Sequence, residues 1–143
     1  MPQAFGLLGL SCRLVSAPGL RKPAVSLIPK ATHLAYQLLN QFDLKPDVDR
    51  SRFDAAWTKF ATFLVDEGLA DHVGPLFERQ PSSGYDTDEE RGYGLMSVIV
   101  FRDKAQADKA WAAIEARAQP LGKLHASVFG LVRDPFFTFW QQS

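Results

Sequence analysis

Apolar residues along the chain gather into four short runs that are typical of β-strands. They cover residues 32–42, 73–80, 93–101 and 123–132, and turn-forming residues follow each run. Residues 93–101 carry no charge and contain the β-branched and aromatic residues that favour strands. This segment is therefore expected at the centre of a sheet.

Two other segments have the spacing of amphipathic helices. In residues 51–68, Ser51 and Asp54 resemble a capping box, and the second helix has Asp103 as its N-cap and ends near residue 120. The apolar face of the first helix consists of Phe53, Trp57, Phe60 and Leu64, and that of the second of Ala107, Ala110, Trp111, Ile114 and Ala118.

The elements follow the order strand, helix, strand, strand, helix, strand. With right-handed crossovers, this order gives the split βαβ plan of the ferredoxin-like fold. We predict an α+β domain of βαββαβ type over residues 31–143, with an antiparallel sheet in the order 4-1-3-2 and two helices on one face. The first and third strands would then lie in the middle of the sheet.

Alternation within the strands predicts which side chains face the helices. A uniformly small or branched set is expected to form the core: Met96, Val98, Val100, Leu124, Ala126, Val128 and Val132. The helix-free face would carry a mixed set: His33, Gln37, Leu39, Tyr93, Leu95, Ser97, Ile99, Phe101, His125, Ser127, Phe129 and Leu131. That set is too apolar for a solvated surface, so we expect a partner subunit or the aromatic C-terminal tail to cover it.

Composition narrows the class of protein. Apolar residues make up 46% of the chain and charged residues 22%, which is typical of a folded globular domain. Cys12 is the only cysteine, so no disulfide or thiolate zinc site can form within one chain. No apolar run is long enough to span a membrane. We expect a soluble protein of a reducing compartment, with no membrane association.

The N-terminal part differs from the rest. Residues 1–40 hold four basic residues and no acid, whereas residues 41–143 hold the other twelve bases and all sixteen acids, a net charge of −4. Residues 1–30 are rich in Pro, Gly and Ser without a regular period, and we interpret them as a poorly ordered extension. We expect a cytoplasmic protein, or an organelle-targeted one if this segment is a transit peptide.

Several short motifs resemble those of the dimeric α+β barrel proteins, which include antibiotic-biosynthesis-type monooxygenases, muconolactone isomerases and stress-responsive barrels. Within that group the chain is most similar to a small family without an assigned function. The motifs are Phe42-Asp43-Leu44-Lys45-Pro46, Glu78-Arg79, Arg102-Asp103, Ala105-Gln106-Ala107-Asp108 with Ala110, His125 with Val128, and the aromatic residues 137–140. The resemblance implies a homodimer with its two sheets packed face to face and small organic ligands bound between the helix-free face and the helices or tail. The acidic loop at residues 85–91 departs from the pattern.

His125 and Tyr93 are the candidate catalytic pair. By alternation both would lie on the helix-free face, where an imidazole beside a phenol could move a proton to or from an enolisable carbonyl compound. Ring-forming and isomerising barrels that resemble this chain use such pairs. The alternative is a structural histidine held by a backbone or interface hydrogen bond.

Candidate ligand contacts extend this site. Arg79 could orient a carboxylate bidentately, although a neighbouring acid is its alternative partner. The other candidates are Gln37, Ser97, Ser127, Phe129 and Trp140. The acidic residues from Asp86 to Glu90 lack the spacing of a calcium loop, and the histidines are too far apart to share a metal, so we expect neither a metal nor a cofactor.

Residues 91–98 match an RNA-recognition signature at its first four positions. Leu95 and Val98 replace two of its aromatic residues, and the domain is net acidic, which opposes phosphate binding. We therefore expect no nucleic-acid partner and keep RNA binding as a minor alternative. The leading hypothesis is a homodimer that binds a partly hydrophobic organic molecule, as a cofactor-free monooxygenase, isomerase or cyclase. The competing hypothesis is a non-enzymatic dimerisation or stress-response module.

Overall fold

The structure is a computed structural model and describes residues 35–143. The expectation of a poorly ordered extension at residues 1–30 lies outside the described residues, as does His33. The elements, in chain order, are β1 (Tyr36–Leu44), α1 (Arg50–Asp66), β2 (His72–Val73), β3 (Phe77–Glu78), a 3-10 turn (Pro81–Ser83), β4 (Leu95–Phe101), α2 (Lys104–Glu115), α3 (Leu121–Phe129) and β5 (Val132–Gln141).

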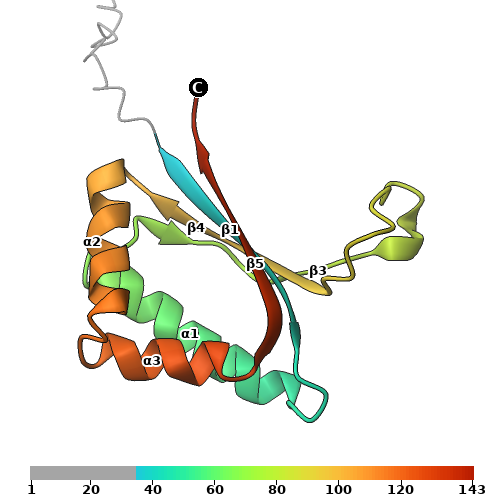
Figure 1. The fold of residues 1–143 in the computed structure, drawn as a ribbon, viewed down its shortest axis with the longest axis horizontal. Coiled ribbons are helices and arrows are strands. Elements are labelled where there is room, and N and C mark those ends of the chain that lie inside the picture. The colour runs from blue at the N-terminus through green and yellow to red at the C-terminus, as the bar shows by residue number, and fades with distance from the viewer. Residues whose placement is uncertain (1–34) are drawn as a thin grey trace, which may run out of the picture. The chain divides into compact units, whose positions relative to one another are not determined.

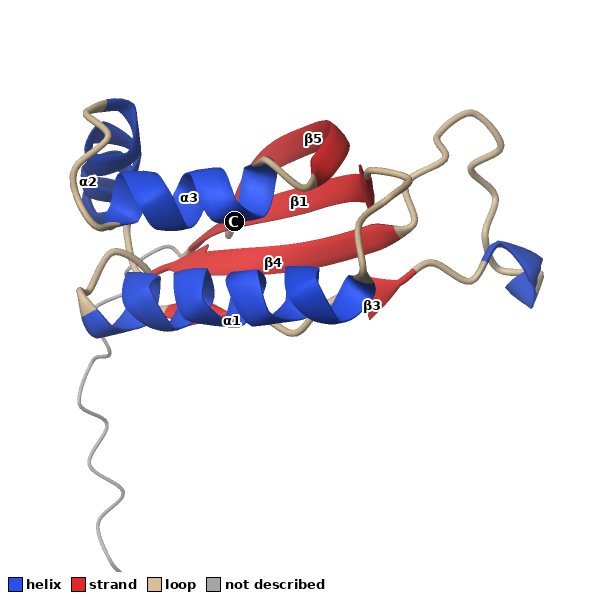
Figure 2. Cartoon of the chain, turned by 90° about the horizontal axis from the view of Figure 1, so that it is seen from below, coloured by secondary structure: helices blue, strands red, loops and turns tan. Residues whose placement is uncertain are grey.

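The strands form one antiparallel sheet in the order β2-β4-β1-β5, and β3 extends the β2 edge by pairing with β4 (Figure 1). This confirms the ferredoxin-like fold class and the order 4-1-3-2, with β1 and β4 in the middle. The prediction of two helices on one face is right about the face, and a third helix joins them there (Figure 2). Within the described part of the chain, no helix is both long and apolar enough to cross a membrane.

The last predicted strand, at residues 123–132, is wrong. Residues 121–129 form helix α3, and the aromatic tail forms the edge strand β5 instead of folding over the sheet. Leu121, Leu124, His125 and Val128 follow helical spacing, whereas Leu124, Ala126 and Val128 also fit the alternation of a strand. In the tail, Phe137 and Phe139 alternate with residues of the opposite face, which is the period of a strand. The second predicted helix accordingly ends at Glu115, before α3 begins.

The predicted faces of the central strand are reversed. Leu95, Ser97, Ile99 and Phe101 are buried beneath the helices, whereas Met96, Val98 and Val100 lie on the helix-free face and are partly exposed. Both sets are largely apolar, so alternation alone could not say which set the helices cover. The helix-free face is therefore the one with methionine and valine at its centre.

The second predicted strand, at residues 73–80, is interrupted. Two short pieces, β2 and β3, flank Gly74 and Pro75. Gly74 still donates its N–H to the carbonyl of Val98, at 2.7 Å, but proline has no N–H to give to the ladder. The pairing therefore stops there and resumes at Phe77.

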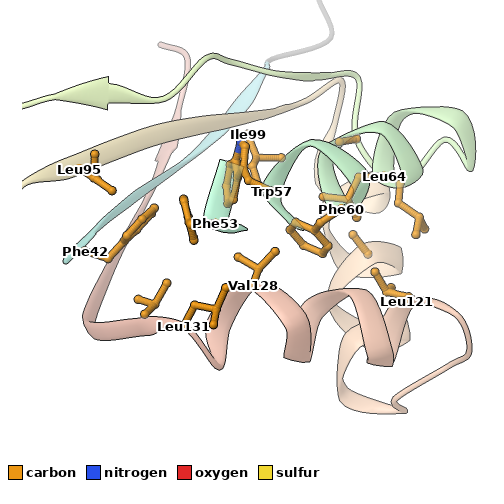
Figure 3. Close-up of a cluster of buried hydrophobic side chains, with 14 of the residues drawn as sticks. Phe42, Phe53, Trp57, Phe60, Leu64, Leu95, Ile99, Leu121, Val128 and Leu131 are labelled. Carbon is orange, nitrogen blue, oxygen red and sulfur yellow. The ribbon is translucent and has the colours of Figure 1, made fainter. Parts of the chain in front are cut away.

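The core lies between α1, α3 and the sheet (Figure 3). Phe42 of β1 contacts Phe53 and Trp57 of α1, with ring centroids 5.4 and 6.2 Å apart, and Val128 of α3 closes the cluster. Burial of a large apolar side chain stabilises a fold by roughly 1.5–3 kcal/mol. The aromatic face predicted for the first helix is thus confirmed as core.

The loop between β3 and β4 projects away from the body of the domain (Figure 1). Arg79 holds it by bonding the carboxylate of Asp86, with Nη2 2.7 Å from Oδ1, and the carbonyls of Asp88 and Arg91. Above all the hydrogen bond from Arg79, and then the bond from the Asp88 N–H, lower the pKa of Asp86 to about 2. Arg79 therefore has a structural role in ordering this loop.

Candidate functional site

A cavity of about 650 Å³, called the main cavity below, lies between the sheet and the three helices. Its volume is within the range that holds small organic molecules, and its walls are almost entirely apolar. The lining residues are Leu38, Asn40, Phe60, Leu64, Ile99, Phe101, Ala107, Asp108, Ala110, Trp111, Ile114, Glu115, His125, Phe129, Pro135, Phe137 and Phe139.

Small side chains on α2 leave the space for this cavity. Ala107 and Ala110 face the sheet from α2, where α1 presents the bulkier Phe60 and Leu64. The predicted inner face of the second helix is correct at both alanines, which are buried. Trp111, on the same helix, is 61% exposed and lies at the mouth of the cavity instead of in the core.

His125 reaches the cavity from α3, not from a strand. Its imidazole stacks on Phe129, with ring centroids 4.5 Å apart, and meets the edge of Phe60 at 6.0 Å. Among the described residues it has no hydrogen-bond partner. Burial lowers the pKa of His125 from its ordinary value and so favours the neutral imidazole, the form that is able to accept a proton.

Asn40 is a polar residue in the cavity wall that the sequence interpretation missed. It is only 1% exposed, and its amide nitrogen donates to the carbonyls of Leu38 and Ser97 at 3.3 and 3.4 Å. Its amide oxygen has no hydrogen-bond donor among the described residues. The available signal was an asparagine between Leu38 and Phe42 on one face of a central strand.

The structure does not bring Tyr93 together with His125, because the two residues line different cavities. Tyr93 stacks on Phe136 at 5.8 Å and lines a separate cavity of about 290 Å³ with Arg79. The alternation that predicts both residues on one face requires a strand at His125. With that segment in a helix, the alternation argument no longer applies.

The other predicted contacts are spread over the domain. Phe129 lines the main cavity beside His125. Ser97 is fully buried behind it, and Ser127 is exposed on α3, where its hydroxyl donates to the carbonyl of Leu124 at 2.7 Å. Gln37 and Trp140 are cross-strand neighbours on the helix-free face.

Charge is confined to the rim of the main cavity. Asp108 and Glu115 are the charged residues that line it, and no lysine or arginine does so. Residues 35–143 contain no group of three or more His, Cys, Asp or Glu side chains that could hold a metal ion.

No protein-family profile and no curated protein matches the sequence. Solved structures do match. They include a variant of SnoaB, a cofactor-independent oxygenase from Streptomyces nogalater, at 12% identity and a TM-score of 0.53, covering 74% of this chain and 90% of that one. A hydroxynitrile lyase from Passiflora edulis matches at 8% identity and a TM-score of 0.55, covering 78% and 95%.

A third similar structure is a dimeric ferredoxin-like protein of unknown function from Thermobifida fusca, at 10% identity and a TM-score of 0.52. It covers 77% of this chain and 92% of that one. At such low identity the likeness concerns the fold and not the chemistry. The chain therefore has the ferredoxin-like fold.

Proposed function

We propose that the main cavity binds a small, largely apolar organic molecule and that His125 transfers a proton to or from it. One observation carries this proposal: an imidazole without a protein hydrogen bond, whose pKa burial lowers, borders an apolar cavity of about 650 Å³. A base in largely apolar surroundings, with no protein partner for its ring nitrogens, can accept a proton from a bound molecule.

Removal of a proton next to a carbonyl would give an enolate. Reprotonation at another carbon is an isomerisation, internal attack closes a ring, and reaction with oxygen is a cofactor-free oxygenation. The similarity in fold to a cofactor-independent oxygenase and to a hydroxynitrile lyase is compatible with chemistry of this kind. Asn40 would orient the substrate, because its amide lies in the same wall.

A generic proton-transfer probe tests the role of His125. In the Kemp elimination of 5-nitrobenzisoxazole, a base takes a carbon-bound proton, the N–O bond breaks and a coloured phenolate forms. We expect catalysis by the parent protein and a loss of about a hundredfold in His125→Gln. Ser127→Ala is the matched control, because Ser127 is exposed on the same helix. Equal rates for His125→Gln and the parent would refute the assignment.

We further propose that two copies pair through the helix-free face. Phe77, Phe136 and Trp140 on this face are 50, 37 and 59% exposed, beside the partly exposed Met96, Val98 and Val100. A contiguous apolar surface of this kind favours association. The similar Thermobifida fusca protein is described as dimeric.

Light scattering during size-exclusion chromatography measures this association. Val98→Lys should give a monomer, whereas Ala55→Lys on the exposed side of α1 should leave the dimer intact. A monomeric parent protein would contradict the pairing. A dimer that neither binds apolar probes nor catalyses the elimination would favour the competing function, a module that only dimerises.

A further inference from the structure

Three side chains of α2 form one stripe along the mouth of the main cavity. Asp108, Trp111 and Glu115 are spaced by three and four residues, so they lie on the same face of the helix, and all three line the cavity. Trp111 is 61% exposed and therefore offers its ring to the entrance. An aromatic ring beside carboxylates is the combination that binds ammonium groups.

The two carboxylates differ in their surroundings. Asp108 already has a partner, because Lys104 Nζ lies 2.7 Å from its Oδ2. Glu115 has no ion-pair or hydrogen-bond partner among the described residues. Glu115 is thus the carboxylate available to an entering cation.

The interior of the cavity offers hydrogen-bond acceptors. The amide nitrogen of Asn40 is committed to two backbone carbonyls, while its oxygen has no donor. Asn40 lines the cavity, so this oxygen is the acceptor that its side chain could offer to a ligand. A neutral His125 adds the lone pair of one ring nitrogen.

Anionic groups lack a partner at this site. No lysine or arginine lines the cavity, and Arg79, the residue expected to orient a carboxylate, is bound to Asp86 in the projecting loop. A buried carboxylate without a cation or several donors is strongly disfavoured. The carboxylates of Asp108 and Glu115 at the rim would also repel an anionic ligand.

We propose that the cavity selects lipophilic amines, with the apolar body of the ligand between the sheet and α2 and its ammonium group between Trp111 and Glu115. This inference rests on the proposed ligand-binding function and adds the chemical class of the ligand. Asn40 would accept a hydrogen bond from a donor on the inner part of the molecule.

Three ligands with one skeleton test this selectivity: 2-naphthylmethylamine, 2-naphthylmethanol and 2-naphthoate. Each displaces the neutral fluorescent probe N-phenyl-1-naphthylamine from the full-length protein. We expect the amine to bind about fivefold more tightly than the alcohol, as one exposed cation–π contact and one exposed ion pair allow. The carboxylate should bind at least about tenfold more weakly than the alcohol.

Glu115→Gln should reduce the advantage of the amine over the alcohol about threefold and leave the affinity for the alcohol unchanged. Glu89→Gln, in the projecting loop, is the matched control and should change neither affinity. An amine advantage that persists in full in Glu115→Gln would overturn the role of Glu115.

The outcomes separate the two proposals. Equal affinities for amine and alcohol, or a carboxylate that binds as tightly as the alcohol, would overturn the amine selectivity and leave the cavity as a ligand site. If N-phenyl-1-naphthylamine itself does not bind, the ligand site is absent and both proposals fail.

Discussion

The two ends of the layer between helices and sheet are built differently. At one end, Phe42, Phe53 and Trp57 are at most 4% exposed and fill the space between β1 and α1. At the other end, Phe137 and Phe139 remain 46 and 50% exposed along a cavity of about 650 Å³. Both ends are aromatic, so composition does not distinguish them. They differ in the size of the helix residues that face the sheet, which are aromatic in α1 and alanines in α2.

Strand β1 belongs to both ends. Phe42 is covered by the aromatic face of α1, whereas Leu38 and Asn40 reach the cavity because Ala107 and Ala110 of α2 leave it unfilled. One strand therefore contributes to stability through its C-terminal part and to the binding site through the residues that precede Phe42. Substitutions should therefore separate stability from binding.

The largest effect is expected in the packed end. Phe53→Ala should lower the free energy of unfolding by about 3–5 kcal/mol, because it removes a fully buried ring and leaves a cavity. Phe139→Ala should cost about 1 kcal/mol, because half of that side chain is already exposed. Urea unfolding of the two variants checks this. Similar losses would show that the two ends do not differ.

A smaller effect, on binding, is expected at the open end. Ala110→Phe should fill the cavity and weaken the binding of N-phenyl-1-naphthylamine by more than about tenfold, because the probe loses its space. Ala112→Phe, on the exposed side of α2, serves as the control. Fluorescence titration measures both variants. Undiminished binding in Ala110→Phe would place the probe elsewhere.

The packed end could be predicted from sequence, and the open end could not. The helical spacing of Phe53, Trp57, Phe60 and Leu64 predicts a buried face, and these residues are at most 4% exposed. Residues 121–129 fit both a helix and a strand, since small and apolar residues occupy either period. The alternation therefore placed His125 on a strand, whereas it lies on helix α3.

The sequence also could not predict which face of the sheet the helices cover. Val98 and Ile99 are equally suited to a core, and only three-dimensional packing decides between them. Asn40 gave a usable signal, because a polar residue in a central strand needs partners on whichever face it lies. The cavity itself depends on residues from β1, β4, β5 and all three helices, and no single segment carries its pattern.

The smallest effect is a shift in pH dependence. Because burial lowers the pKa of His125, its neutral form persists below pH 6.5, and the acid limb of the elimination rate should have its midpoint below that value. The same pKa shift affects stability. The unfolded chain binds the proton more readily than the folded protein, so stability should decrease as pH falls below 6.5. A rate profile measured against free imidazole checks the midpoint. A midpoint above 6.5 would place His125 in a solvated or acidic setting.

The most direct test is where an apolar probe binds on the folded protein. In a methyl NMR titration with N-phenyl-1-naphthylamine, we expect shifts at Leu38 and Ile99, which face the cavity, and none at Val98 and Val100 on the helix-free face. Shifts confined to Val98 and Val100 would contradict the account, because the ligand would then bind the helix-free face and not the cavity beside His125.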